Sequence, residues 1–125
     1  MVAGGQITSS QLNDWMLRLS KQVGEAITQL EAAGDEAPEA RFAYEKKWAQ
    51  IYESLPPEDS VASREAAANN ATVSERRDYE RARNRLKRAE KVLGARMAQL
   101  SALQSVGASV REEARFERTG PGVTT

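Results

Sequence analysis

The chain has 125 residues, with 18 basic and 18 acidic side chains, so its formal net charge is zero. It contains no cysteine and no histidine, which excludes disulfides, thiolate and imidazole catalysis and the usual zinc sites. The start of the chain lacks the basic and apolar segments of a secretory signal, and the uncharged stretch 97–110 is too short to span a bilayer. We therefore expect a cytoplasmic protein with no membrane segment.

Charge is divided unevenly between the two halves of the chain. Residues 1–59 carry five basic and ten acidic side chains, whereas residues 60–125 carry thirteen and eight. Opposite charge favours antiparallel or head-to-tail matching between helices, and it leaves a basic surface that a polyanion could contact. Because large aliphatic residues are scarce beside many alanines, a thick monomeric core is not expected, and we predict a homo-oligomer or a helical hairpin with a thin apolar seam.

The first helix is predicted over residues 9–33, after a flexible lead-in at 1–8. Thr8 and Gln11 have the spacing of a capping box, and Gly34 supplies a stop. The apolar positions recur every three or four residues, as on one face of a helix. They are Leu12, Met16, Leu19, Val23, Ala26, Leu30 and Ala33.

Two further helices are predicted before residue 70. The second covers 38–55, with Pro38 in its first turn and Pro56 directly after its end. Its apolar face consists of Tyr44, Trp48, Ile51 and Leu55. A short third helix is expected over 60–68, capped by Asp59 or Ser60 and ended by Asn69 and Asn70.

The longest predicted helix covers 73–118 and is followed by a flexible tail at 119–125. Thr72 and Glu75 have the spacing of a second capping box. Apolar or small residues then recur with heptad spacing, which is typical of coiled-coil packing. They are Tyr79, Ala82, Leu86, Ala89, Leu93, Leu100, Leu103, Gly107, Val110 and Ala114, with Arg96 in the same register.

These elements define the expected fold class. It is all-α, a single helical domain over residues 9–118 that forms an elongated helical hairpin or bundle. Its long C-terminal heptad helix is expected to oligomerise through coiled-coil-like packing.

No catalytic constellation emerges from the sequence. Adjacent acids such as Glu112 and Glu113 point to different sides of a helix, which is poor geometry for shared acid/base chemistry. The serines have no histidine to activate them, and no glycine-rich segment has the spacing of a phosphate loop. We expect a protein that is not an enzyme, with no catalytic residue, metal or cofactor.

Two basic regions are candidates for nucleic-acid binding. In one, basic residues alternate with aromatic residues between 41 and 52; in the other, residues 76–91 carry eight basic side chains and three acids. Arginine suits phosphate because it donates two parallel hydrogen bonds, and aromatic rings can stack on unpaired bases. The candidate residues are Arg41, Lys46, Lys47, Tyr52, Arg81, Arg85, Lys87 and Arg88. Two alternatives stay open: the basic run could pair with the acidic first half, and Trp48 could belong to the core.

The uncharged stretch 97–110 is the candidate for self-association. Its small residues permit close helix approach, and a helix segment without charge is expected to be enclosed by partners. Arg96 lies just before this stretch, where a polar residue can fix the register of a coiled coil. The candidate interface residues are Leu93, Arg96, Met97, Leu100, Leu103, Gly107 and Val110.

The segments 102–108 and 110–117, together with Lys46, Lys47, Trp48 and Tyr52, resemble UvsY-type recombination mediators of tailed phages. Those small helical proteins help to load a RecA-like recombinase onto single-stranded DNA. The sequence departs from the family at Trp48, where a basic residue would be expected.

The resemblance implies a ring-like homo-oligomer built through the C-terminal helix in a phage-infected bacterial host. It also implies weak single-stranded DNA binding and contacts with a RecA-like recombinase and a single-strand binding protein. Two other classes stay open: a phage structural or scaffold-type assembly protein, and an adaptor or inhibitor that binds one host protein.

Overall fold

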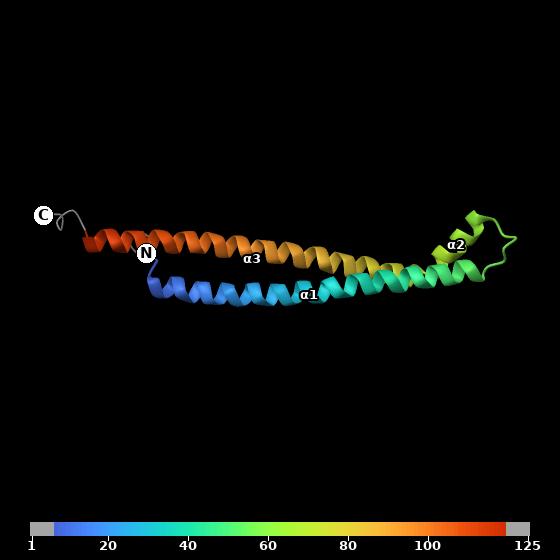
Figure 1. Cartoon of the computed structure of the whole chain (residues 1–125), viewed down its shortest axis with the longest axis horizontal. Helices are drawn as coiled ribbons and strands as arrows, with labels where there is room; N and C mark the ends of the chain where they lie inside the picture. Colours follow the sequence, from blue (N-terminus) through green and yellow to red (C-terminus); the bar gives the residue numbers. More distant parts are fainter. Residues whose placement is uncertain (1–6, 120–125) are drawn as a thin grey trace, which may run out of the picture. The chain divides into compact units, whose positions relative to one another are not determined.

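The computed structural model of the chain is all-α, and it describes residues 7–119. Three helices follow one another: α1 (Ser9–Ser54), α2 (Val61–Ala71) and α3 (Val73–Thr119) (Figure 1). The expected all-α class is therefore confirmed. Of the flexible ends predicted at 1–8 and 119–125, residues 1–6 and 120–125 lie outside the described residues, and Thr119 is the last residue of α3. None of the helices in the described part is long and apolar enough to cross a membrane.

The chain divides into two compact units, each formed by segments of α1 and α3. Unit 1 contains Met1–Ile27 and Val92–Thr125, and unit 2 contains Thr28–Lys91, which includes α2. In each unit the two long helices are antiparallel. In unit 1 a Cβ atom placed on Gly107 would lie 3.2 Å from Leu12 Cδ2, which shows how closely the start of α1 and the end of α3 approach.

The heptad positions of α3 form the inward face of each unit. From Tyr79 to Val110 every position of the predicted stripe is buried or half-buried, and only Ala114 is exposed. The fully buried hydrophobic residues are small with one exception: they are Leu12, Ala26, Ala33, Ala37, Ala68, Ala82 and Ala89. Small side chains on facing helices permit a short interaxial distance, so the helices pack closely without a thick core.

The predicted break after Ala33 is wrong, because α1 is one helix of 46 residues that contains Gly34 and Pro38. Ala33 and Ala37 are both buried, so the three-or-four spacing of inward positions continues through the expected turn. Packing on this continuous stripe outweighs the local preference of glycine and proline. Proline does end the helix where no such packing follows: α1 stops at Ser54, directly before the predicted limit.

Two of the three predicted caps are confirmed. Thr8 N donates to Gln11 Oε1 and Gln11 N donates to Thr8 Oγ1, both at 3.1 Å, which is a closed capping box. Ser63 N donates to Ser60 Oγ at the start of α2. This helix extends three residues beyond its predicted end, to Ala71.

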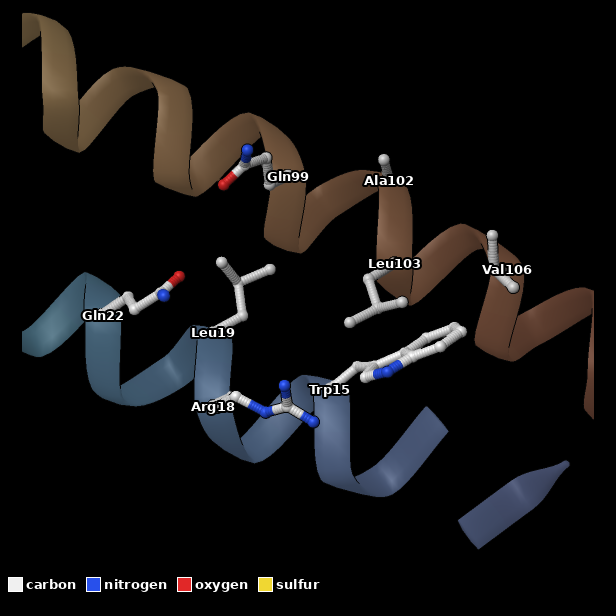
Figure 2. Close-up of a pocket in the computed structure, with 8 residues that line it drawn as sticks. All are labelled: Trp15, Arg18, Leu19, Gln22, Gln99, Ala102, Leu103 and Val106. Carbon is white, nitrogen blue, oxygen red and sulfur yellow. The ribbon is translucent and has the colours of Figure 1, made fainter. Parts of the chain in front are cut away.

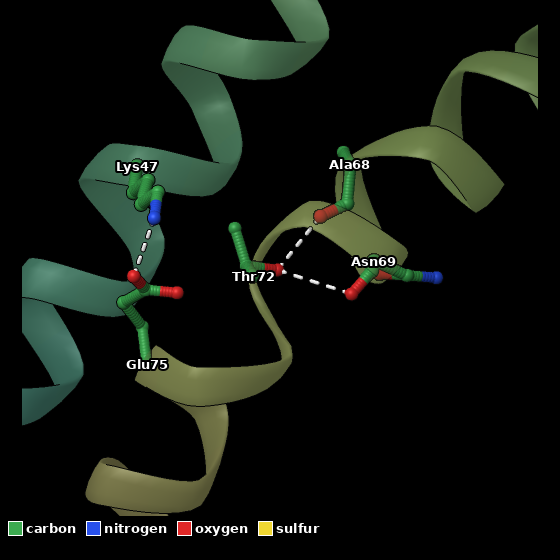
Figure 3. A network of polar contacts seen from close by, with 5 residues as sticks. All are labelled: Lys47, Ala68, Asn69, Thr72 and Glu75. Carbon is green, nitrogen blue, oxygen red and sulfur yellow. Dashed lines mark hydrogen bonds and ion pairs between the residues drawn. The ribbon is translucent and has the colours of Figure 1, made fainter.

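The third predicted cap, at Thr72 and Glu75, is replaced by other contacts. Thr72 is fully buried, and its hydroxyl donates backwards to the Ala68 carbonyl at 2.7 Å, which closes the end of α2 (Figure 3). The Glu75 carboxylate accepts a hydrogen bond from Lys47 of α1. Thr72 therefore caps the C-terminal end of α2, and Glu75 links α3 to α1.

Candidate functional site

Two of the predicted nucleic-acid residues form ion pairs between α1 and α3 within unit 2. Lys47 Nζ donates to Glu75 Oε1 (Figure 3), and Arg85 donates to both carboxylate oxygens of Glu36. The hydrogen bond from Lys47 lowers the pKa of Glu75 below its ordinary value. The pair of Arg85 and Glu36 supports the alternative in which the basic run pairs with the acidic first half, whereas in the other pair the basic residue, Lys47, comes from the first half and the acid, Glu75, from the second.

Arg41 and Lys46 lie on the exposed side of α1. Arg41 Nε donates to Glu45 Oε1 at 2.9 Å, one helical turn further along, and this contact raises the pKa of Arg41. Both partners are more than half exposed, so the pair adds little stability and can exchange for another anion. Lys46 is exposed and forms no ion pair among the described residues.

Tyr52 belongs to an aromatic cluster at the end of α1. Its ring stacks on Trp48 with centroids 5.2 Å apart, and the Arg64 guanidinium lies over it at 4.2 Å. Trp48 is half-buried and donates from Nε1 to Asn69 Oδ1 at 2.8 Å, which joins α2 to α1. The Tyr52 ring thus has two partners within the chain, so it is poorly placed to stack on a base.

Four arginines of α3 lie on one side of the helix, and we call them the arginine stripe: Arg77, Arg81, Arg85 and Arg88. Their spacing of four, four and three residues places them within an arc of about 80° at 3.6 residues per turn. All four are exposed, and Asp78 borders them. Apart from Arg85, none forms an ion pair within the described part of the chain.

The stripe differs from the predicted set in two respects. Arg77 was not among the predicted residues, although its spacing of four from Arg81 is visible in the sequence. Lys87 is exposed but lies on another side of α3, away from Arg81 and Arg88. The structure therefore brings Arg81, Arg85 and Arg88 together and leaves Lys87 apart.

The predicted interface residues mostly face α1 of the same chain. Leu93, Arg96, Leu100, Leu103 and Val110 are half-buried. Gly107 is buried, and in the same chain Leu12 leaves no free space for a side chain there. Met97 differs, because it is 55% exposed. The uncharged stretch 97–110 thus packs on one side within unit 1 and keeps its other sides exposed.

An open groove of about 490 Å³ lies on one side of unit 1, between α1 and α3. Trp15, Leu19 and Leu103 extend into the space between the two helices (Figure 2). The other residues that line it are Arg18, Gln22, Gln99, Ala102 and Val106. Leu19 and Leu103 belong to the two predicted apolar stripes, but the groove itself was not among the predicted sites.

Comparisons with protein-family models, with curated proteins and with solved structures found no match. Among the described residues, no group of three or more histidine, cysteine, aspartate or glutamate side chains could hold a metal ion.

Proposed function

We propose that the chain is a non-enzymatic, oligomeric accessory protein that binds single-stranded DNA and assists the loading of a RecA-like recombinase. The observation that carries this proposal is the arginine stripe. Arg77, Arg81 and Arg88 present three exposed guanidinium groups on one side of α3, without an acid bound to them in the described structure. Guanidinium groups bind phosphate oxygens in pairs, and a row of them can follow a nucleic-acid backbone.

The contacts within unit 2 favour phosphate binding over base recognition. Tyr52 is engaged by Trp48 and Arg64, so no aromatic ring of this cluster is offered freely to a base. Binding through arginine and phosphate is independent of sequence and weakens with salt because it releases counterions. We expect weak, sequence-tolerant affinity, as a loading factor requires if the recombinase is to displace it.

The test replaces Arg77, Arg81 and Arg88 together with glutamine and measures affinity for a fluorescent oligonucleotide over a series of salt concentrations. The slope of log K against log salt should become shallower by about 2, because each phosphate contact on a single strand contributes about 0.7. A control variant replaces Arg18, Lys21 and Arg83 with glutamine. These residues are exposed outside the arginine stripe, so the control has the same net charge as the test variant. Equal losses in both triple variants would show that only net charge matters.

Failure to bind single-stranded DNA at about 50 mM salt, where phosphate contacts are strongest, would reject the proposal. The recombinase step is tested separately, by filament assembly on DNA covered with a single-strand binding protein. If the chain binds DNA without speeding filament assembly, only the DNA-binding part of the proposal is retained.

The second candidate is a structural or scaffold-type assembly protein. It is favoured by the exposed, uncharged sides of the stretch 97–110, which a DNA-binding role does not require. Self-association without any DNA affinity would support it. A monomer that binds neither DNA nor itself would instead favour an adaptor or inhibitor of one host protein.

A further inference from the structure

Within the described part of the chain, Arg85 is the one member of the arginine stripe that is bound to an acid. Its Nε donates to Glu36 Oε2 at 3.2 Å, and its Nη2 donates to Glu36 Oε1. Two nitrogens of one guanidinium group thus face the two oxygens of one carboxylate. Arginine binds two oxygens of a phosphate group with the same paired geometry. The Glu36 carboxylate therefore stands where a phosphate group would bind.

Glu36 reaches the arginine stripe from the neighbouring helix of unit 2. It directly precedes the buried Ala37 of α1, and Arg85 directly precedes the half-buried Leu86 of α3. In an antiparallel pair, residues that directly precede inward positions lie on the same side of both helices, because successive residues are turned by about 100°. The acid and the stripe therefore share one side of unit 2.

Arg85 has another arginine of the stripe on each side of it. Arg81 comes four residues earlier and Arg88 three residues later, which places them about 6 Å and about 4.5 Å away along the helix axis. The carboxylate of Glu36 is thus held at the middle of a row of three guanidinium groups. A nucleic-acid backbone that followed this row would have to place a phosphate group at the same position.

The ion pair between Arg85 and Glu36 is open to solvent. The side chain of Arg85 is 49% exposed and that of Glu36 is 46% exposed. Exposed ion pairs are weak because water screens the charges and both long side chains lose freedom. A phosphate group can therefore reach Arg85 and replace the carboxylate without separating α1 from α3.

We propose that Glu36 is an internal competitor for phosphate on the arginine stripe. Without nucleic acid, its carboxylate holds Arg85. When a nucleic-acid backbone binds, a phosphate group displaces the carboxylate, and Arg85 joins Arg81 and Arg88 in binding the backbone. Breaking the ion pair lowers the net affinity, so Glu36 keeps the binding weak. This inference rests on the proposed function and names the residue that sets the strength of that binding.

A second exposed ion pair of unit 2 provides the matched control. Arg41 Nε donates to Glu45 Oε1 at 2.9 Å, and both side chains are more than half exposed. Glu45 directly follows the inward-facing Tyr44, whereas Glu36 directly precedes an inward position, so the two acids lie on opposite sides of α1. Replacing either acid with glutamine releases one arginine and raises the net charge by one. Only the change at Glu36 releases an arginine of the stripe.

The test measures the affinity of the full chain for a fluorescent thymine oligonucleotide over a series of salt concentrations. Glu36→Gln should bind about three- to fivefold more tightly than the wild type at low salt, the upper range for one exposed arginine contact. Its slope of log K against log salt should be steeper by about 0.7, because one more phosphate group is bound. Glu45→Gln should change the affinity less than about twofold and leave the slope unchanged.

A double variant, Glu36→Gln with Arg85→Gln, shows whether Arg85 makes the additional contact. Its salt slope should return to that of the wild type, because both chains then offer the same three arginines to phosphate. A steeper slope that persists in the double variant would overturn the inference, since the gain would then come from the lost negative charge alone. Circular dichroism confirms that each variant keeps its helices before the affinities are compared.

The outcomes separate this inference from the proposed function. If the wild type binds the oligonucleotide and the two single variants have equal affinities and slopes, the proposed function is kept and the competitor role of Glu36 is rejected. If Glu36→Gln binds but the wild type does not, the competitor role is supported and the proposed function fails for the natural chain. If no chain binds at about 50 mM salt, both are rejected.

Discussion

Glu75 shows how a single contact changes the role of a residue that has a clear local pattern. Its spacing from Thr72 predicts a capping box, yet its carboxylate accepts a hydrogen bond from Lys47, 28 positions earlier in the chain. The ammonium group stabilises the charged carboxylate, so the pKa of Glu75 falls below its ordinary value of 4.5. The contact therefore makes the stability of unit 2 depend on pH.

The sign of that dependence follows from proton binding. Because the pKa of Glu75 is lower in the folded chain, the folded state binds fewer protons than the unfolded state near pH 4. The stabilisation is present above pH 4.5 and is lost as the pH falls through the lowered pKa of the folded state. In Glu75→Gln this contribution is absent, so its thermal unfolding temperature should fall less than that of the wild type on acidification.

Thermal unfolding followed by circular dichroism, at neutral pH and at about pH 3, checks this prediction. Glu53→Gln is the control, since Glu53 is exposed and forms no ion pair among the described residues. Identical acid sensitivity in Glu75→Gln and in the wild type would show that the pair contributes nothing.

At the scale of the element, α1 shows what local sequence signals could and could not predict. The apolar spacing identified every inward position of α1 from Leu12 to Ala33, and these are all buried or half-buried. Gly34 and Pro38 predicted a break because each weakens a helix locally. The helix continues because Ala33, Ala37 and Tyr44 keep the same inward side, a register that the sequence already contained.

Pro38 should therefore destabilise the chain where it stands. It donates no hydrogen bond and its ring opposes the carbonyl of Gly34, one turn earlier; a proline inside a helix costs about 3 kcal/mol. Pro38→Ala should raise the free energy of unfolding by about 1–3 kcal/mol. Chemical denaturation measures the change.

The control for Pro38→Ala is Glu39→Ala, at the next exposed position, which should stay within about 0.5 kcal/mol of the wild type. A Pro38→Ala variant no more stable than this control would mean that α1 has already adapted to the proline.

At the scale of the whole molecule, the sequence predicted which residues face inward but not what they face. The heptad positions Leu100, Leu103 and Gly107 fit equally well against another copy or against the same chain. The contact of Gly107 with Leu12 resolves this for unit 1. The ion pair between Arg85 and Glu36 could not be predicted from local sequence patterns either, because 49 positions separate the two residues.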